Sequence, residues 1–237
     1  MPHKVLTNIV LTNDDGIDAP GIEALYQAIA SISDDTTIGV VAPDQHLSGC
    51  SHQINRGNCA IDVKQQAPQR YALGGTPADC TRVAHHLYPK LNWLLSGINS
   101  GGNLGADIYV SGTVAAAREA TLLRVPAISF SQYKNQSIPI DWERATHQTA
   151  RVLKVLMDKP IAAGQFWNVN LPLNSPSQTE PDIVFCPVCT QPLPTESSLE
   201  AGQFRYTGTY KNRRRDPGAD VDVCFSGNIS VSKVCLW

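Results

Sequence analysis

Two adjacent carboxylates, Asp14 and Asp15, lie in a polar turn that follows the apolar segment 8–12. Neighbouring side chains of a strand point to opposite faces of the sheet. In a turn just beyond the strand, both carboxylates are able to face one cation. A tight turn followed by a helix cap is the alternative interpretation of this motif taken alone. The pair therefore indicates a cation site only if further ligands reach it.

Two later loops supply oxygen-bearing side chains for such a site. Ser48 carries a hydroxyl in the polar segment 44–51, and Asn99 carries an amide in the glycine-rich segment 96–105. Carboxylate, amide and hydroxyl oxygens are hard ligands, which favour Mg²⁺ or Mn²⁺ over zinc. We expect one divalent cation per subunit, and its predicted ligands are Asp14, Asp15, Ser48 and Asn99.

The glycine-rich segment also leads into a helix start that suits an anion. Glycine lets the backbone approach a ligand closely, and the first turn of a helix offers N–H groups at the positive end of the dipole. A plain glycine-rich connection remains the alternative, because loose glycine patterns are weak signals. The candidate substrate- and phosphate-binding residues are Asn13, Gly16, Ser48, Gly49, Gly101, Gly102, Asn103, Ser111, Gly112 and Thr113.

A divalent cation beside an anion-binding loop indicates phosphoryl chemistry. The cation polarises a phosphate oxygen and lowers the pKa of a bound water, and Asp14 or Asp15 accepts the proton of that water. Asp14, Asp15 and Asn99 are the predicted catalytic residues. Two other readings stay open: an aspartyl-phosphate phosphatase with Asp14 as nucleophile, and a nucleotide-binding sensor without turnover. A dinucleotide dehydrogenase is disfavoured, because the glycine loop does not follow the first strand.

Apolar strands alternate with amphipathic helices over most of the chain. Strands are predicted at 8–12, 37–41, 93–95, 125–130 and 166–170, and helices after Asp18, Thr76, Ser111 and Asp141. This alternation predicts an α/β fold whose Rossmann-like, mostly parallel sheet is flanked by helices in three layers. Ligands of such sheets bind at the carboxyl ends of the strands. All three polar loops described above fall at those ends.

The composition changes after residue 174. We predict a catalytic core over residues 1–174 and a β-hairpin-rich C-terminal extension over 175–237 that is not an independent domain. Strands are expected at 183–185, 204–207, 221–225 and 229–234, with a hairpin turn at 226–228. Short, proline-interrupted strands need another surface to cover their apolar side chains. We therefore expect the extension to join subunits into a homodimer or homotetramer.

Composition limits the partners and the location. The 237 residues include 19 basic and 21 acidic side chains, a net charge of −2, which argues against a nucleic-acid polymer or a membrane surface as partner. The N-terminus lacks a signal-peptide pattern, and seven scattered cysteines suit reduced thiols, so we expect a cytoplasmic protein. The spacing of Cys186 and Cys189 resembles half of a zinc or redox motif. Without a second pair, an incidental spacing is the favoured interpretation, and a metal or redox role is the alternative.

Several motifs together resemble those of the SurE family, the stationary-phase survival proteins that act as divalent-metal-dependent 5'(3')-nucleotidases. They are Asn13-Asp14-Asp15-Gly16, Ala42-Pro43-Asp44 with Ser48-Gly49, Gly75-Thr76-Pro77-Ala78-Asp79, Ser96-Gly97-Ile98-Asn99 and Ser111-Gly112-Thr113. The resemblance implies hydrolysis of nucleoside monophosphates, with short polyphosphate as an occasional substrate. It places the metal ligands at Asp14, Asp15, Ser48 and Asn99, and it implies dimers or tetramers with exchanged C-terminal arms.

Some positions depart from the family pattern. Gln45-His46-Leu47 precedes Ser48, Ala106-Asp107 stands where an acidic pair is usual, and Arg124-Val125 replaces a glycine-led pair. These changes spare the expected metal ligands and bear on substrate preference and rate. The sequence leaves open the preferred base, the 5' or 3' position of the phosphate, and the physiological metal.

Overall fold

The structure is a computed structural model that describes residues 8–33, 35–57, 59–135, 138–173 and 180–237. The helices are α1 (Pro20–Ala30), α2 (Pro77–Leu87), α3 (Gly112–Leu122), α4 (Trp142–Leu156) and α5 (Asp220–Phe225), with short 3₁₀ helices η1 (Gly105–Tyr109) and η2 (Tyr210–Asn212). The strands are β1 (Asn8–Thr12), β2 (Thr37–Pro43), β3 (Val63–Ala67), β4 (Arg70–Leu73), β5 (Trp93–Ser100), β6 (Ala127–Gln132), β7 (Gln165–Leu171), β8 (Ile183–Phe185), β9 (Ser197–Glu200), β10 (Gln203–Tyr206) and β11 (Ile229–Cys235).

Within the described residues, nine strands form one sheet in the order β3-β4-β2-β1-β5-β6-β7-β11-β8. Pairing is parallel from β4 through β7, whereas β3 runs antiparallel to β4 and β11 runs antiparallel to β7. The mostly parallel α/β sheet is therefore confirmed. The chain leaves β1 toward β2 on one side, and it returns to β5 on the other. That reversal places a switch point at the carboxyl end of β1.

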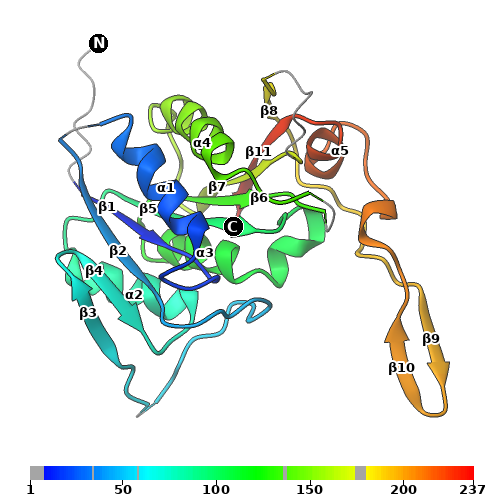
Figure 1. Ribbon diagram of the computed structural model, residues 1–237, viewed down its shortest axis with the longest axis horizontal. Helices are drawn as coiled ribbons and strands as arrows, with labels where there is room; N and C mark the ends of the chain where they lie inside the picture. Colours follow the sequence, from blue (N-terminus) through cyan, green and yellow to red (C-terminus); the bar gives the residue numbers. More distant parts are fainter. Residues whose placement is uncertain (1–7, 34, 58, 136–137, 174–179) are drawn as a thin grey trace.

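Helices cover both faces of the sheet, so the predicted three layers are confirmed (Figure 1). One apolar cluster joins α1 and α4 to the sheet, with Leu25 and Leu153 completely buried. The second cluster joins α2 and α3 to the opposite face, with Ala84 and Val114 completely buried. Burial on both faces explains why the central strands are almost continuously apolar. The resulting rigid sheet fixes where the strand ends project their polar loops.

The helix starts mostly follow their predicted caps. Thr76 and Asp79 form a capping box on α2, and the Asp141 and Ser111 side chains accept hydrogen bonds at the starts of α4 and α3. Asp18 does not cap α1, contrary to the expectation that this helix begins directly after Asp18. Ala19 occupies its N-cap without a side-chain bond, and Pro20 is the first helical residue. The fixed φ of proline suits this position, so α1 begins without help from Asp18.

The prediction that the strand near 93–95 ends before a single glycine loop was wrong. β5 continues to Ser100, with an irregularity in its pairing to β6 between Ser96 and Asn99. Gly97 lies inside this strand, where the backbone of the neighbouring strand β6 comes too close to leave room for a side chain. A Cβ at Gly97 would lie 2.3 Å from the carbonyl oxygen of Phe130. Asn99 consequently projects from the end of a strand rather than from a free loop.

The C-terminal segment divides between the central sheet and a projecting hairpin. β8 and β11 belong to the central sheet, and β9 and β10 form a separate antiparallel pair that extends away from it (Figure 1). The strand expected at 221–225 is instead helix α5, and 226–228 connects α5 to β11. Alternating apolar residues here pack Val221 and Cys224 onto one side of a short helix. The division into a catalytic core over residues 1–174 and a C-terminal extension over 175–237 that is not an independent domain stays a prediction.

Candidate active site

The carboxyl ends of β1 and β5 bring two of the predicted polar segments together. The two strands pair in parallel, with Thr12 opposite Ser96, so the turn after β1 lies beside the last residues of β5. Helix α3 begins at the same edge, where a Cβ on Gly112 would lie 2.9 Å from the Cβ of Asp14. The absence of a side chain at Gly112 thus lets the helix start press against the first carboxylate.

Asp14 is buried, and its carboxylate is anchored to the start of α3. The Thr113 hydroxyl donates to Asp14 Oδ1 across 2.5 Å. The pKa of Asp14 is raised to about 6, mainly by burial; the Thr113 hydrogen bond lowers it and the nearby charge of Asp15 raises it by smaller amounts. Since only 3% of Asp14 is exposed, water does little to stabilise its negative charge. A cation beside the carboxylate would provide that stabilisation.

Asp15 faces the solvent side of the same turn and is held by two neighbours. Its Oδ2 accepts a hydrogen bond from the backbone N–H of Ser100 across 2.9 Å. Its Oδ1 lies 3.2 Å from His46 Nδ1. The first contact places the Asp15 carboxylate against the peptide that joins Asn99 to Ser100. The structure therefore brings Asp14, Asp15 and Asn99 to one site.

The loop between β2 and β3 covers this site from the other side. The N–H of Leu47 donates to the carbonyl oxygen of Asp14 across 2.8 Å, and the Ser51 hydroxyl donates to the carbonyl of Tyr109 across 2.9 Å. Between these anchors lies Ser48, whose side chain is exposed. The loop thus brings Ser48 near Asp14 and leaves it free to turn toward a ligand.

The two asparagines of the glycine-rich segment have different surroundings. Asn99 Nδ2 donates to the carbonyl of Gly101 across 2.7 Å, which leaves the amide oxygen as an acceptor. Asn103 is buried in a polar network: its Nδ2 donates to Ser131, and its carbonyl oxygen accepts from Asn168 and Asn170. Asn103 therefore holds the loop to β6 and β7. Its side chain is already engaged within the protein.

Asn13 likewise serves the turn in which it lies. Its Nδ2 donates to the carbonyl of Gly16 across 2.7 Å, and its Oδ1 accepts from the N–H of Gly16 across 3.2 Å. This reciprocal pair closes the turn that presents Asp14 and Asp15. Ser111 caps α3 by accepting from Val114 across 3.1 Å. Asn13 and Ser111 thus support the backbone of the site with their side chains.

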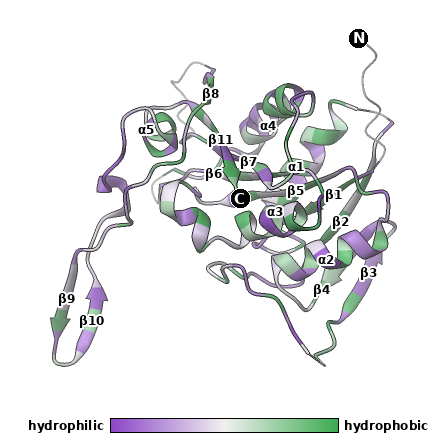
Figure 2. Cartoon of the chain, turned by 180° about the vertical axis from the view of Figure 1, so that it is seen from behind, coloured by the Kyte–Doolittle hydropathy of each residue, from purple (hydrophilic) through white to green (hydrophobic). Residues whose placement is uncertain are grey.

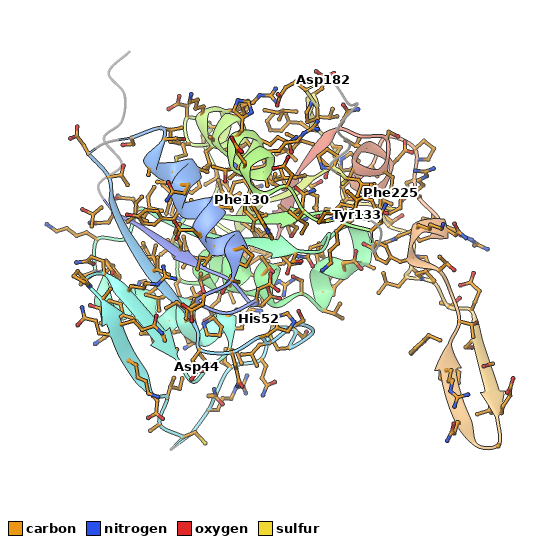
Figure 3. The ribbon with its side chains drawn as sticks, in the orientation of Figure 1. Asp44, His52, Phe130, Tyr133, Asp182 and Phe225 are labelled. Atoms are coloured by element: carbon orange, nitrogen blue, oxygen red, sulfur yellow. The ribbon has the colours of Figure 1, made fainter. Side chains whose placement is uncertain are left out.

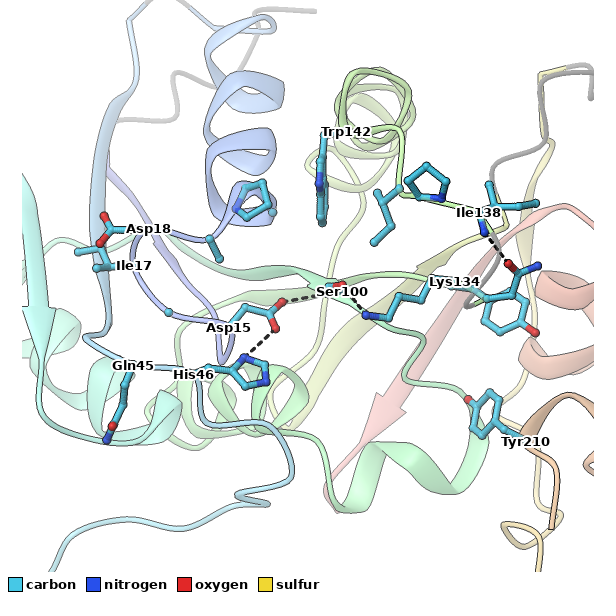
Figure 4. Close-up of a pocket in the computed structure, with 18 of the residues that line it drawn as sticks. Asp15, Ile17, Asp18, Gln45, His46, Ser100, Lys134, Ile138, Trp142 and Tyr210 are labelled. Carbon is cyan, nitrogen blue, oxygen red and sulfur yellow. Dashed lines mark hydrogen bonds and ion pairs between the residues drawn. The ribbon is translucent and has the colours of Figure 1, made fainter. Parts of the chain in front are cut away.

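A cleft of about 1550 Å³ opens beside Asp15 (Figure 4). The turn after β1, the first turn of α1, the loop after β2 and the segment after β6 line it, and residues 208–211 from the base of the hairpin line it as well. Ser100, Lys134 and Trp142 belong to this lining and were not singled out from the sequence. The signal for Lys134 was present, because it follows a predicted strand whose carboxyl end lies at this same edge.

The C-terminal segment supports the far side of the site. Asp220 Oδ2 accepts from the N–H of Gly105 across 2.8 Å. Tyr133, which lines the cleft, stacks on Phe225 at the end of α5 with ring centroids 4.6 Å apart (Figure 3). The end of the glycine-rich segment is therefore held by Asp220, 115 positions further along the chain. Contacts between residues so far apart along the chain leave no regular spacing in the sequence, so they were not predicted.

The residues present fit a hard divalent cation. The donor set consists of the two carboxylates of Asp14 and Asp15, the amide oxygen of Asn99 and the hydroxyl of Ser48, all oxygen ligands of the kind that Mg²⁺ and Mn²⁺ take. The buried, poorly solvated charge of Asp14 suits a nearby cation. The described residues contain no group of three or more His, Cys, Asp or Glu side chains placed to hold a metal. The fit therefore rests on a mixed set of oxygens.

Comparison with known proteins decides the family. Residues 9–193 match the family model described as survival protein SurE. The chain belongs to the SurE family. A Nostoc protein (strain PCC 7120) named "Putative 5'-nucleotidase" is 47% identical over 95% of this chain and 98% of its own length. The protein named 5'-nucleotidase SurE from Azorhizobium caulinodans is 41% identical over 94% of this chain and 91% of its own length.

A solved structure of the SurE family has the same architecture. The crystal structure of the SurE protein from Aquifex aeolicus matches with a TM-score of 0.81 and 28% identity, over 97% of this chain and 94% of that chain. The mostly parallel sheet with helices on both faces is thus a SurE fold. Among the described residues, no helix of this SurE-family chain is both long and apolar enough to cross a membrane.

Proposed function

We propose that this chain, a 5'-nucleotidase of the SurE family, hydrolyses nucleoside 5'-monophosphates to nucleoside and phosphate with one divalent cation per subunit, Mg²⁺ or Mn²⁺. One observation carries the proposal: Asp14 and Asp15 lie together at the end of β1, against the start of α3, and beside the cleft. The relatives named 5'-nucleotidase support the substrate class.

The cation would lie among Asp14, Asp15, Ser48 and Asn99. When bound, it supplies polarisation of a phosphate oxygen and a water of lowered pKa. The chain itself provides orientation. Thr113 holds the Asp14 carboxylate in place, and the N–H of Ser100 holds that of Asp15. One of these two carboxylates accepts the proton of the attacking water.

The start of α3 and the glycine-rich segment would receive the phosphate. A helix N-terminus presents N–H groups and the positive end of its dipole. Fixed donors of this kind stabilise charge that develops on the equatorial oxygens. The direct contact of the helix start with Asp14 supports this role for Gly112 and Thr113.

The nucleoside would occupy the cleft. Its volume of about 1550 Å³ exceeds the roughly 300–1,000 Å³ of typical ligand pockets, so it has room for a base and a ribose. Trp142, at the first position of α4, and Tyr133 give it aromatic surface. These side chains support binding of a planar base, and they do not distinguish one base from another.

Finer features belong to the same proposal. Hydrolysis of 3'-monophosphates and hydrolysis of short polyphosphate are further activities to test, and a nucleotide sensor without turnover is the non-enzymatic alternative.

Self-association through the C-terminal extension is proposed from the exposed apolar residues of its hairpin, Leu199, Phe204 and Tyr206. A cytoplasmic location is supported by the seven cysteines, all of which are free thiols.

Phosphate release from a panel of nucleoside 5'- and 3'-monophosphates and tripolyphosphate tests the proposal. Each substrate is assayed with Mg²⁺, with Mn²⁺ and with a chelator. We expect cation-dependent release from 5'-monophosphates that the chelator abolishes. Equal rates with chelator would overturn the cation requirement, and nucleotide binding without release would favour the sensor.

A further inference from the structure

Lys134 brings a positive charge next to the carboxylate pair. It lies just beyond the end of β6, which pairs in parallel with β5 so that Gln132 is opposite Ser100. Lys134 Nζ donates to Ser100 Oγ across 2.8 Å, and the N–H of Ser100 donates to Asp15 across 2.9 Å (Figure 4). A single residue, Ser100, therefore connects the ammonium group to the site.

The charge of Lys134 is not neutralised within the described part of the chain. Its partner there is a neutral hydroxyl, and no carboxylate lies within ion-pair distance of it among those residues. Two arginines of the structure, by contrast, are ion-paired, whereas Lys211 lines the same cleft as Lys134. Arg213 pairs with Asp107, and Arg82 pairs with Glu119. Lys134 thus differs from them in presenting an uncompensated ammonium to an open cleft.

A positive charge at this place would favour the proposed reaction. A phosphomonoester carries up to two negative charges, and it must approach two carboxylates. Additional positive charge on the equatorial oxygens offsets the repulsion and stabilises the charge that develops during transfer. A lysine ammonium is a compact point charge that binds phosphate well.

We propose that Lys134 binds the phosphoryl group of the substrate and the phosphate product, with the Ser100 hydroxyl holding its ammonium in the cleft. The assignment rests on the proposed function for its substrate, but phosphate binding tests it without turnover. Its main competitor is a purely electrostatic role, in which Lys134 only offsets the negative charge of Asp14 and Asp15. The two roles make opposite predictions for phosphate and for the cation.

Calorimetric titration of inorganic phosphate into the full chain with saturating Mn²⁺ measures the first role directly. Lys134→Met removes the charge and keeps most of the side-chain length, Lys134→Arg restores a charge, and Lys154→Met on the exposed surface of α4 is the matched control. A separate Mn²⁺ titration measures cation affinity, and thermal unfolding checks folding.

We expect the phosphate Kd to rise on the order of tenfold or more in Lys134→Met, the size of a lost hydrogen bond to a charged group. Lys134→Arg should recover part of the affinity, and Lys154→Met should match the unmodified chain. The Kd for Mn²⁺ should change less than about threefold. The KM for the nucleotide should rise in Lys134→Met in parallel with the phosphate Kd.

An unchanged phosphate Kd in folded Lys134→Met, or tighter Mn²⁺ binding as the sole effect, overturns the assignment and leaves the proposed function intact. Loss of phosphate affinity in a chain that hydrolyses no nucleotide supports Lys134 and overturns the proposed function. Absence of phosphate binding by the unmodified chain with Mn²⁺ overturns both.

Discussion

Arg213 Nη1 donates to Asp107 Oδ2 across 2.8 Å, although 106 positions separate the two residues. The Arg213 side chain is completely buried, and Tyr210 donates a second hydrogen bond to the same carboxylate oxygen. Arg213 also donates to the carbonyl of Leu104. The base of the projecting hairpin is thereby joined to the end of the glycine-rich loop. One arginine of the basic run 211–215 thus forms an interior ion pair.

Arg213→Met should destabilise the protein by about 3–5 kcal/mol, because it leaves the Asp107 carboxylate buried without its cationic partner. Arg214→Met is the matched control, since that neighbouring side chain is exposed. Urea unfolding of both variants measures the difference. If Arg213→Met is as stable as Arg214→Met, the ion pair does not hold the loop.

Asp14→Asn and Asp15→Asn should each lower turnover on the order of 10²-fold or more, because each removes a charged oxygen from the cation site while keeping its shape. Folding should survive in both. Asp14→Asn in particular removes a buried carboxylate, and the pKa of this carboxyl is raised to about 6, mainly by burial. Steady-state rates at saturating Mn²⁺ and thermal unfolding are the measurements. Near-normal rates in both variants would end the metal hypothesis.

Asn99→Ala and Asn103→Ala should fail in different ways. Asn99→Ala is expected to weaken Mn²⁺ binding with little change in stability, because it removes an expected ligand oxygen and only the hydrogen bond from Nδ2 to Gly101. Asn103→Ala is expected to cost about 1–3 kcal/mol of stability, because it leaves the buried Ser131 hydroxyl without its partner. Metal titration and urea unfolding of both variants separate the two effects. The opposite pattern would contradict the assignment of Asn99.

Glu119→Gln should destabilise the protein near pH 7 by about 1–3 kcal/mol, and the difference should shrink in acid. Burial raises the pKa of Glu119, but His52 and Arg82, at 2.8 Å and 2.7 Å, outweigh it and hold the pKa below 4.5. A lowered folded-state pKa stabilises the protein above 4.5, and this stabilisation is lost as pH falls through the folded value.

The check on Glu119 is a comparison of unfolding midpoints for Glu119→Gln and the unmodified chain from pH 7 to pH 3. Arg82→Met provides a second variant, which removes one cation while keeping the carboxylate. A constant difference between Glu119→Gln and the unmodified chain over that range would show that charge on Glu119 is unimportant for stability.

Removing the projecting hairpin should reduce self-association without unfolding the core. Leu199, Phe204 and Tyr206 are 70%, 57% and 80% exposed, and Figure 2 shows hydrophobic colour on β9 far from the body of the protein. Thr207 N–H donates to the carbonyl of Glu196 across 2.8 Å, so a short glycine linker is able to replace residues 197–206. Light scattering compares the oligomeric masses. A monomeric full chain, or an unchanged mass after deletion, would refute the role of the hairpin.

Truncation at residue 174 is a poorer test of that role than the hairpin deletion. It would remove β11, which pairs with β7 along six residues of the central sheet, from Ser230 opposite Asn170 to Cys235 opposite Gln165. Loss of this strand exposes a buried edge. An unfolded truncated chain would then report on the sheet rather than on association.

The sequence correctly predicted the helices and strands that depend mainly on residues close to one another along the chain. The alternation of apolar strands and amphipathic helices predicted the layered α/β fold, and the capping box at Thr76 and Asp79 predicted the start of α2. Predictions from neighbouring residues alone also explain the error at residues 221–225. Val221, Val223 and Phe225 alternate as in a strand, yet they lie in the short helix α5. A six-residue apolar pattern is compatible with either element, and packing against the sheet decides between them.

For the site, sequence by itself determined which residues carry oxygen donors and that the segments bearing Asp14 and Ser48 follow strands. Only the tertiary structure decided that Asn103 is held in an interior network, that β5 extends to Ser100, that Lys134 contacts Ser100, and that Arg213 pairs with Asp107. Strand order and register set these contacts, because they bring together side chains whose separation along the chain carries no periodic signal.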